Sequence, residues 1–559
     1  MAKVKKAKAE KSVKTKKSKE VKAEKPVKGK KGKRSGVDYA EEAMAIMAKT
    51  RNVREVHLND KANEEYYKYG IAVIEDRAIF GSIDGLKPVA RRALWAAHKM
   101  GLRHNVKADK SAKVVGETLG SYHPHGDQAC YGALITAAKS PINMVDGEGN
   151  WGTMNDGAAA MRYTNMRLSL YADLVFFDRF YLPTIDYVPN YDGSKFEPLI
   201  LPALLPNALL NGNFGITPGV NTRTPSYSLK TVLNVVRAAL KDGKCTPKMC
   251  MDLEFTTKYG GKAVRDKEEL MRFYKTGRGS VEFQSVHTDV DLKNEIRFDQ
   301  FAPFSDIEKV LAKVDGIAGV AATRDDSDKY DKHQVAYVVT FAKSCKGDAL
   351  KTAIKKVEQA FSASWRFSVQ VTDRFVNPDG TDGAKLRPTT VPDLLQYWID
   401  YRIKLEQDAC TFWIKKRKEE IADKELLRLA VKMRDFIINA IKEKEKLTDE
   451  ELAQYIAKKL KITVEQANRI LDLKIRQLRA LEDKKLAGEI KALEAEYKSY
   501  EGRKKNPIKY ILTHLDSIEQ QLNDEIAKRT KAIATARAKG KGKSETKGKK
   551  RSKSEDDDE

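Results

Sequence analysis

Cysteine is scarce in this sequence, and the few cysteines lie far apart. The chain has five of them, Cys130, Cys245, Cys250, Cys345 and Cys410. This number and spacing exclude a disulfide framework, and the one close pair has no second pair of ligands beside it that would complete a zinc site. We therefore expect reduced thiols in a reducing compartment.

Long apolar runs are also missing. No stretch of about 18 apolar residues is present, and the first residues contain no apolar signal segment. We therefore expect a chain that stays in the cytoplasm and has no membrane partner. Hydrophobic residues make up 41% and charged residues 33% of the 559 positions, which allows two to four domains with at least one large core.

Acidic residues are outnumbered most strongly at the two ends of the chain. Residues 1–35 carry 16 Lys or Arg against three Glu, and residues 528–559 carry 12 against six acids, so the ends hold most of the net charge of +25. Such segments bury too little apolar surface to fold, so we predict disordered basic tails at 1–36 and 528–559, the second with an acidic end. Salt-dependent attraction to phosphate backbones is one interpretation, and a solubility or localisation tail is the alternative.

Two helices separated by a short turn are expected within residues 110–139. The stretch "SAKVVGETLG" precedes the turn "SYHPHGD", and "DQACYGALITAAK" follows it. Asp127 is the expected N-cap of the second helix, and Leu134, Ile135 and Ala138 are its expected buried side. The pattern predicts a helix–turn–helix whose second helix is available to a DNA groove.

Residues 226–388 combine helical patterns with alternating strand patterns. Examples of the latter are "SVEFQSVHTDV" and "HQVAYVVTFAK", which predict strands of an α+β domain. The acid-rich stretch "TRDDSDKYD" at 323–331 is interpreted as a solvated loop rather than a metal site.

Glycine and proline are absent from Asp393 to Ala487, a run of 95 residues. Apolar residues recur at helical spacing in two runs, first at Leu394, Trp398, Tyr401, Leu405 and Phe412, then at Leu486, Ile490, Leu493, Tyr497 and Tyr500. The pattern predicts a long helix going out, a knob of short amphipathic helices, and a long helix coming back. Since such a knob has little core of its own, we expect a homodimer, with a monomeric helical bundle as the alternative.

The stretch "AAAMRYTNMRL" at 158–168 places Tyr163 beside Arg162, with Arg167 nearby. A phenol has a pKa of about 10 and is a poor nucleophile until cationic neighbours favour the phenolate. Guanidinium groups also stabilise the charge that develops on phosphate oxygens during attack on a phosphodiester. The residues are therefore of the types that nucleophilic attack by a tyrosine on DNA requires.

Five motifs in fixed order resemble one family. They are "GLKPVARRALW" (85–95), "KSAKVVGETLGSYHPHGD" (110–127), "MVDGEGNWGT" (144–153), "AAAMRYTNMRL" (158–168) and "LPALLPNALLNGNFGI" (201–216). Together they resemble the breakage-reunion region of type IIA DNA topoisomerases, in particular the A subunits of gyrase and topoisomerase IV. The later stretch "ILDLKIRQLRALE" is similar to the C-gate of that family.

The resemblance implies an α+β multidomain fold. Its expected parts are a winged-helix breakage-reunion domain at 37–225, an α/β tower domain at 226–388, and a long antiparallel coiled coil with a helical C-gate. In the coiled coil, the outgoing helix is expected at 389–446, the dimerising knob at 447–487 and the returning helix at 488–527.

The resemblance also assigns roles to residues. Tyr163 matches the nucleophile that forms a 5′-phosphotyrosyl bond, Arg162 would stabilise the transition state, and His125 and Arg77 would act at the same phosphate. Ile216 matches an isoleucine that wedges between base pairs and bends the duplex. The expected DNA-contacting set is Lys87, Arg91, Arg92, Lys113, Ser121, His123, Gln128, Arg167 and Ile216, with a structural role as the alternative for His123.

Some positions depart from the family pattern. Ala90 stands where the family usually has histidine, and the sequence from Pro218 onward differs around the DNA-bending element. Gln128 and Gly132 replace the serine and acid through which bacterial relatives hold quinolone drugs, so we expect weak quinolone sensitivity.

The family's ATP-binding and acidic metal-binding patterns are not found in this sequence. The resemblance therefore implies that Mg²⁺ and ATP are bound by a B-type partner subunit, with no metal site in this chain. No box or domain for wrapping DNA follows the returning helix, so relaxation and decatenation of double-stranded DNA are expected rather than supercoiling. Short A-type subunits are also found in topoisomerases of large bacteriophages. If this chain is viral, we expect it in the cytoplasm or nucleoid of the host cell.

Two other functions remain open at this point. A relaxase-type nicking enzyme would use His123 and His125 as a His-x-His metal pair beside a tyrosine, although here a proline separates the histidines and no third ligand is evident. An architectural DNA-binding protein would explain the basic tails and the helix–turn–helix, but would leave the Arg162–Tyr163 pair without a role.

Overall fold

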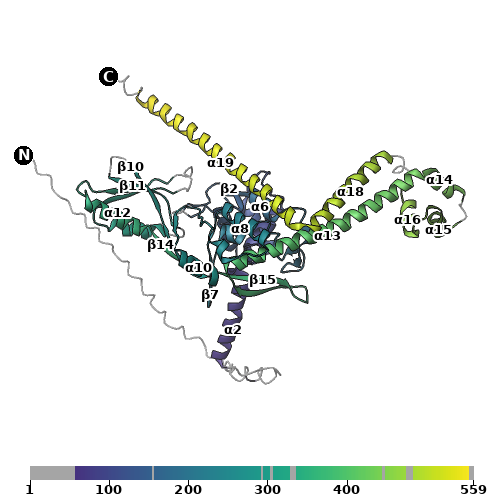
Figure 1. Ribbon diagram of the computed structural model, residues 1–559, viewed down its shortest axis with the longest axis horizontal. Coiled ribbons are helices and arrows are strands. Elements are labelled where there is room, and N and C mark those ends of the chain that lie inside the picture. The colour runs from purple at the N-terminus through teal and green to yellow at the C-terminus, as the bar shows by residue number, and fades with distance from the viewer. Residues whose placement is uncertain are drawn as a thin grey trace, which may run out of the picture. The chain divides into compact units, whose positions relative to one another are not determined.

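The structure is a computed structural model that describes residue 44 and residues 57–153, 157–290, 294–302, 306–327, 335–443, 447–473 and 483–552 (Figure 1). The predicted tail at 1–36 lies outside these residues. Helix α2 (Leu58–Val73) is followed directly by a five-residue π-helix, η1 (Ile74–Ala78). Among the described helices, none combines the length and apolarity that a membrane span needs.

The two helices predicted within residues 110–139 and the turn between them are present. They are α4 (Ser111–Ser121) and α5 (Asp127–Lys139), preceded by α3 (Pro88–Lys99), which starts with a proline at its first position. An antiparallel sheet in the order β1-β3-β2 lies beside the helices, formed by β1 (Asp109–Lys110), β3 (Asn165–Leu168) and β2 (Val145–Glu148).

The start of α5 differs from the prediction. The N-cap is Gly126, not Asp127, and no side chain caps the helix. Gly126 has a φ of 29°, a positive value that glycine adopts at little steric cost. Asp127 lies in the first turn instead, where a carboxylate is favoured by the helix dipole. Leu134 and Ala138 are buried as predicted, and Ile135 packs against the same core while partly exposed.

His98 on α3 is a half-buried histidine whose ring stacks between two aromatic rings. Its centroid lies 4.4 Å from that of Phe177 and 5.4 Å from that of Trp95. Burial, with a contribution from the nearby Arg103, lowers the pKa of His98 to about 4. The imidazole is therefore neutral in the folded protein at neutral pH.

This burial predicts a pH dependence of stability. In the unfolded chain His98 has a pKa near 6.5, so between about pH 6.5 and 4 the unfolded state binds more protons and stability falls as the pH falls. His98→Phe keeps the stacking but binds no proton. Its melting temperature should therefore fall less between pH 7 and pH 5 than that of the parent chain. Equal falls in both proteins would contradict this prediction.

A series of short elements connects the helix–turn–helix to the next sheet. They are α6 (Leu170–Phe176), η2 (Leu182–Thr184), β4 (Tyr187–Pro189), β5 (Phe196–Pro198) and α7 (Asn207–Asn211). A hairpin of β6 (Asn213–Thr217) and β7 (Val220–Thr224) follows, and it carries Ile216. Gly219 takes a φ of 76° in the turn of this hairpin.

The α+β composition predicted for 226–388 is confirmed. Its helices are α8 (Leu229–Asp242), α9 (Pro247–Cys250), α10 (Lys267–Thr276), α11 (Ile307–Asp315) and α12 (Asp348–Ala360). Its strands are β8 (Lys262–Val264), β9 (Arg278–Gln284), β10 (Val286–Val290), β11 (Glu295–Gln300), β12 (Val320–Asp325), β13 (Tyr337–Phe341), β14 (Ala363–Ser368), β15 (Gln370–Val376) and β16 (Asp382–Pro388). Both alternating sequence patterns form strands as expected, at β9–β10 and β13.

These strands form three sheets. One has the order β6-β7-β14-β9-β8, so the Ile216 hairpin is part of it. A second has the order β10-β11-β13-β12, and its core includes side chains from α11 and α12. Strands β15 and β16 pair with each other as a separate two-stranded ribbon.

Two long helices run side by side in opposite directions after β16 (Figure 1). Along α13 (Val391–Lys432) and α18 (Asp483–Lys505), ion pairs join Arg417 to Glu496, Lys424 to Glu489 and Arg428 to Asp483. The partner number falls as the first number rises, which establishes the antiparallel direction. Between them lie α14 (Arg434–Glu443), α15 (Asp449–Leu460) and α16 (Val464–Leu471). Helices α15 and α16 lie in the predicted knob, whereas the outgoing helix predicted for 389–446 ends at Lys432 and α14 follows as a separate helix.

The helices differ from the prediction in three respects. The apolar run from Leu394 to Leu405 packs into the main core, which also includes Ile511 and Leu515 of the returning segment, and Trp398 donates a hydrogen bond to the Ala203 carbonyl there. The returning segment is two helices, because Pro507 cannot continue α18 and instead begins α19 (Pro507–Ser552). Helix α19 extends through the predicted disordered tail to Ser552, in a stretch that contains no proline after residue 507.

Candidate functional site

Tyr163 lies on an exposed turn immediately before β3. Its backbone N–H donates to the Ala160 carbonyl at 2.8 Å, and its side chain is accessible, with 65% of the residue exposed. The guanidinium carbon of Arg162 lies 4.7 Å from the centre of the Tyr163 ring. The turn therefore presents a phenol to solvent with a cation on its face.

A buried hydroxyl network fixes the residue that follows this tyrosine. Thr164 Oγ1 donates to Ser111 Oγ at 2.8 Å and lies 2.9 Å from Tyr131 Oη. The Ser111 N–H donates to the Thr164 carbonyl at 3.0 Å, and Tyr131 Oη donates to the Ala159 carbonyl at 2.7 Å. The turn is thus attached to α4 through Ser111 and to α5 through Tyr131, on both sides of Tyr163. The sequence reasoning missed this network, because partners 33 and 53 residues away give no local signal.

Removing the Thr164 hydroxyl should therefore destabilise the protein. In Thr164→Val the buried Ser111 hydroxyl loses its donor, which costs about 1–3 kcal/mol of unfolding free energy. Urea denaturation measures the change. Thr136→Val, on the exposed side of α5, is the matched control and should change stability by less than about 0.5 kcal/mol. Equal effects of the two substitutions would show that the network does not hold the turn.

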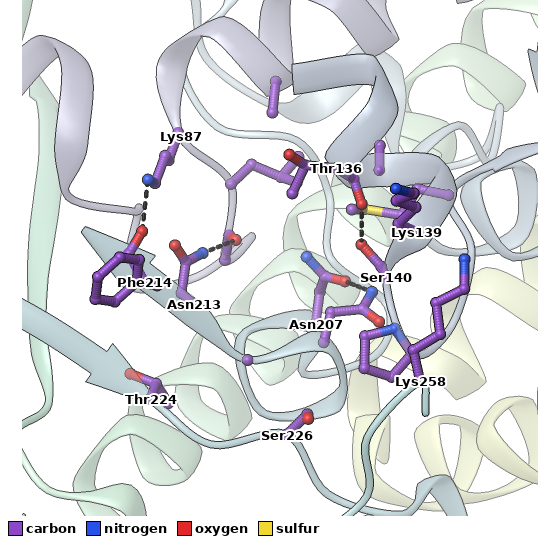
Figure 2. A pocket seen from close by; sticks show the side chains of 18 of the residues that line it. Lys87, Thr136, Lys139, Ser140, Asn207, Asn213, Phe214, Thr224, Ser226 and Lys258 are labelled. Atoms are coloured by element: carbon purple, nitrogen blue, oxygen red, sulfur yellow. Dashed lines mark hydrogen bonds between the residues drawn. The ribbon is translucent and has the colours of Figure 1, made fainter. Parts of the chain in front are cut away.

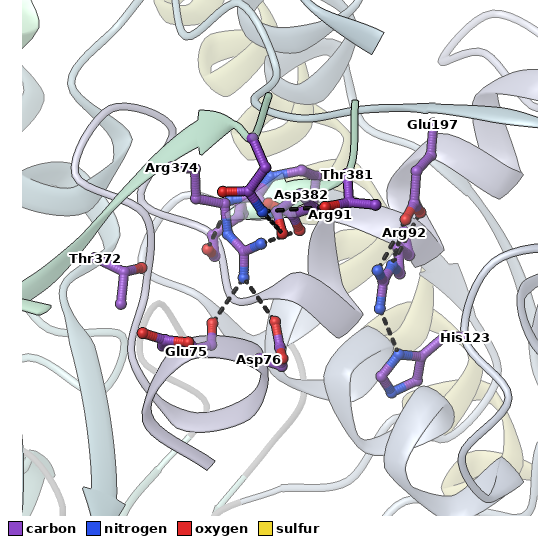
Figure 3. A network of polar contacts seen from close by, with 12 residues as sticks. Glu75, Asp76, Arg91, Arg92, His123, Glu197, Thr372, Arg374, Thr381 and Asp382 are labelled. Carbon is purple, nitrogen blue, oxygen red and sulfur yellow. Dashed lines mark hydrogen bonds and ion pairs between the residues drawn. The ribbon is translucent and has the colours of Figure 1, made fainter. Parts of the chain in front are cut away.

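Four of the predicted site residues lie close together around the turn between α4 and α5. Arg92 pairs with Glu197 at 2.8 Å and places Nη1 3.2 Å from His123 Nδ1 (Figure 3). The rings of His123 and His125 lie 4.8 Å apart. Burial and the neighbouring cations Arg92 and Arg77 lower the pKa of His123 to about 4. Arg92, His123 and His125 thus form one cluster, with Arg77 near enough to lower the pKa of His123.

The protonation of His123 follows from this geometry. Since a guanidinium can only donate, Nδ1 of the neutral imidazole accepts from Arg92, and the proton is on Nε2. Two arginines beside His123 are unfavourable for a cation, so the His-x-His metal pair of a relaxase is not supported by this arrangement. His125 is exposed beside the start of α5, and its backbone N–H donates to the His123 carbonyl at 2.8 Å.

Two predicted DNA-contacting residues are buried in the scaffold. The side chain of Arg91 is 5% exposed and pairs with Asp84 at 2.6 Å. Ser121 donates to Glu117 at 2.8 Å, accepts from Lys195 at 2.7 Å and is buried. These side chains offer little surface to a DNA strand. The burial of Arg91 could not be predicted from the motif "GLKPVARRALW", because nothing in the sequence marks Asp84 as its ion-pair partner.

Three others lie at the surface. Gln128 is exposed in the first turn of α5, and Lys113 is exposed with an ion pair to Asp109 at 2.8 Å. Arg167 on β3 pairs with Asp146 on β2 at 2.8 Å and also donates to the Val106 carbonyl at 2.8 Å. Arg167 is therefore held in position by the sheet, whereas Gln128 and Lys113 are accessible from solvent.

The Ile216 hairpin is tied to the start of α3. Lys87 Nζ donates to the Phe214 carbonyl at 2.6 Å (Figure 2), and Ile216, two residues on, is 67% exposed. Gly215 leaves no room for a side chain, since a Cβ there would lie 2.2 Å from the Ala78 carbonyl oxygen. The hairpin is thus packed against the end of η1, the helix that carries Arg77.

A cavity of about 710 Å³ opens beside this hairpin (Figure 2). Its lining includes four cationic side chains, Arg77, Lys87, Lys139 and Lys258. Burial, together with the neighbouring Lys139, lowers the pKa of Lys258 to about 8. Cationic side chains therefore line this cavity from Arg77 to Lys258, within residues 255–259.

The structure leaves Tyr163 and the His125 cluster as separate groups. Within the described residues, no hydrogen bond joins the Tyr163 side chain to His125 or Arg77. The described residues also contain no group of three or more His, Cys, Asp or Glu side chains placed to hold a metal ion. Cys245 and Cys250, the closest cysteines, are buried with their sulfur atoms 3.9 Å apart.

Comparison with known proteins gives consistent matches. Residues 77–517 match the family described as the A subunit of DNA gyrase/topoisomerase IV. The chain is 32% identical over 457 residues to the A subunit of DNA topoisomerase 4 from Salmonella typhimurium, covering 80% of this chain and 58% of that protein. It is 29% identical over 495 residues to the A subunit of DNA gyrase from Kosmotoga olearia, covering 85% of this chain and 58% of the relative. The chain thus spans a little over half the length of these relatives.

Proposed function

The chain belongs to the family of DNA gyrase and topoisomerase IV A subunits, and from this membership we propose that it is the DNA-cleaving and resealing subunit of a type IIA topoisomerase. The observation that carries the proposal is the exposed Tyr163 on a turn fixed by buried hydrogen bonds, with Arg162 on its ring. An architectural DNA-binding protein would need no such arrangement.

The proposed reaction is a transesterification. Tyr163 Oη attacks a backbone phosphorus, the bond from phosphorus to the 3′ oxygen breaks, and the 5′ phosphate remains on the tyrosine. The phenol loses one proton and the departing 3′ oxygen takes one up, so no net proton is consumed. Because one ester replaces another, the reverse attack by the 3′ hydroxyl reseals the strand without ATP at that step.

Side chains beside Tyr163 and near His123 are proposed to supply the charge for this step. We propose that Arg162, Arg77 and His125 contact the phosphate, where guanidinium groups stabilise the additional charge of the transition state. Arg92 is already paired with Glu197, so its role is to hold His123, and through the His123 carbonyl the backbone of His125.

The hairpin supplies the means of bending the duplex. Ile216 places an apolar side chain that is 67% exposed on a strand of this hairpin, where it is accessible to a bound duplex. We propose that it inserts between base pairs, which partly unstacks them and bends the duplex. The hydrogen bond from Lys87 would keep the hairpin aligned with α3, whose neighbours α4 and α5 would form a winged helix with β1, β2 and β3.

The remaining functions are proposed for partners. The described donor side chains do not fit a metal ion, so no step is assigned to a metal held by this chain. We propose that a B-type subunit provides Mg²⁺ and ATP hydrolysis, that two copies of this chain associate through the knob at 447–487, which includes α15 and α16, as a C-gate, and that residues 226–388 form the tower. Relaxation and decatenation in the cytoplasm or nucleoid, of a host cell if the chain is viral, are the proposed activities.

One experiment tests the chemistry and the residue together. The chain is combined with its B-type subunit, Mg²⁺, ATP and catenated DNA, the reaction is stopped with detergent, and the DNA-linked peptide is identified by mass. Recovery of the peptide containing Tyr163 is expected. A link at a different tyrosine, or no covalent product together with unchanged decatenation, would overturn the assignment.

A further inference from the structure

Arg374 on β15 is a buried arginine to which neither the family motifs nor the reaction above gives a role. Its side chain is only 2% exposed, and its guanidinium group joins two parts of the chain (Figure 3). One nitrogen pairs with Asp382 on β16, and the other donates to the backbone carbonyl of Glu75 at 2.7 Å and lies 3.6 Å from Asp76. The contacts thus reach from the β15–β16 ribbon to η1.

Glu75 and Asp76 directly precede Arg77 in η1. A π-helix has wider turns than an α-helix, is rare, and is frequently found at functional sites. The carbonyl that Arg374 holds is two residues before Arg77, whose own side chain is exposed. The guanidinium group of Arg374 therefore contacts the two residues that precede Arg77.

The same strand also holds the backbone after Arg77. The Thr372 N–H and hydroxyl donate to the Phe80 carbonyl at 2.9 and 3.1 Å, and the Ser82 N–H donates to the Thr372 carbonyl at 2.9 Å. Both sides of Arg77 are consequently attached to β15, nearly 300 residues further along the chain.

Stability alone does not account for an arginine at this position. Burying a charge is costly, and here Arg91 is close enough that it and burial lower the pKa of Arg374. An apolar side chain would fill the same space at a lower cost of desolvation. A guanidinium group differs from an apolar side chain because it donates hydrogen bonds in fixed directions. Its planar fork therefore fixes two acceptors, Asp382 and the Glu75 carbonyl, relative to each other.

The ribbon also connects this position to the long helix. Strand β16 ends at Pro388, and α13 begins at Val391, with Thr390 as its N-cap. The start of α13 is therefore joined to η1 through two paired strands and the guanidinium group of Arg374.

We propose that Arg374 is a positioning residue for DNA cleavage, which acts by holding η1 so that Arg77 points at the scissile phosphate. The proposal rests on the proposed topoisomerase function, and it adds a residue that does not touch DNA. In this proposal the β15–β16 ribbon connects α13 to the cleavage site, so the position of α13 affects the position of Arg77.

The test compares two arginines on the same ribbon. Arg374→Lys keeps a positive charge but replaces the two-pronged fork with a single nitrogen. Arg387→Gln is the control, since Arg387 on β16 pairs with Asp373 at 2.6 Å and makes no contact with η1 among the described residues. For each full-length variant with its B-type subunit and Mg²⁺, the rate of covalent adduct formation with a plasmid and the affinity for the same plasmid are measured.

Arg374→Lys should lower the cleavage rate about 10- to 100-fold, because a displacement of about 1 Å has that effect on aligned reacting groups. The affinity for DNA should stay within about twofold, and the control should cleave like the parent chain. An unchanged cleavage rate in Arg374→Lys, or an equal loss in Arg387→Gln, would overturn the proposal.

A second comparison separates positioning from a general structural effect. In an Arg77→Ala background, Arg374→Lys should cause no further loss of cleavage, whereas a residue acting independently of Arg77 would lower the rate by the same factor again. If Arg374→Lys does not fold, the Arg374→Met/Asp382→Asn double variant, which removes both charges of the buried pair, takes its place with the same expectations. Loss of the adduct in Tyr163→Phe but not in these variants would leave the topoisomerase function standing and reject this role for Arg374.

Discussion

Tyr163→Phe is expected to abolish covalent capture of DNA and to lower relaxation and decatenation by about 10⁴-fold or more, the scale of losses when a nucleophile is removed. The substitution removes one oxygen atom and keeps the ring on which Arg162 lies. The turn should keep its shape, since its hydrogen bonds come from the backbone and from Thr164. The loss should therefore appear in the chemical step and not in folding.

Detergent-trapped adduct on supercoiled plasmid measures the effect, and DNA affinity is measured in parallel. Tyr191→Phe is the matched control, because Tyr191 is also exposed and its hydroxyl donates only to the Gly120 carbonyl among the described partners. The control should form adduct like the parent chain. Persistent adduct in Tyr163→Phe would remove Tyr163 from the reaction and with it the proposed mechanism.

The second large effect is expected at Arg162. Arg162→Ala should lower the rate of adduct formation by about 10²–10³-fold, the usual loss when one group that stabilises developing oxyanion charge is removed. Two causes combine here. The cation on the Tyr163 ring no longer favours the phenolate, and the phosphate loses a donor in the transition state.

Arg162→Lys separates these causes. A lysine keeps the charge near the phenol but lacks the planar fork that binds phosphate oxygens in pairs, so an intermediate rate is expected. Arg272→Ala, at an exposed arginine that pairs with Glu269 on α10, is the control for a general loss of positive charge. If Arg272→Ala reduces cleavage as much as Arg162→Ala, the effect is one of DNA attraction and not of catalysis.

Local features of the fold could be predicted from the sequence alone. The helices α4 and α5 and the turn between them follow from apolar spacing and from the glycine of "SYHPHGD". The strands β9 and β13 follow from alternation, and the short helices α15 and α16 begin at capping boxes formed by Thr448 and Thr463. In each case the deciding contacts lie within a few residues.

Contacts across long sequence distances could not be predicted. Arg91 and Arg92 are adjacent in one basic motif, but their surroundings differ. Arg91 is buried in an ion pair with Asp84, whereas Arg92 pairs with Glu197 and contacts His123. The apolar run of α13 looked like one seam of a coiled coil, yet its first part enters the main core through Trp398. Spacing shows which side of a helix is apolar, but not which surface covers that side.

For this protein the sequence by itself determined the chemical groups: a tyrosine beside an arginine, two histidines in a turn, and an isoleucine, in motifs whose order resembles one family. Only the tertiary structure decided how those groups are held. Thr164 attaches the Tyr163 turn to two helices, His123 is neutral because it is buried beside arginines, and Arg374 reaches η1 from a strand nearly 300 residues away. The physical reason is that burial and hydrogen-bond direction depend on neighbours in space, which chain order specifies only after the whole core has packed.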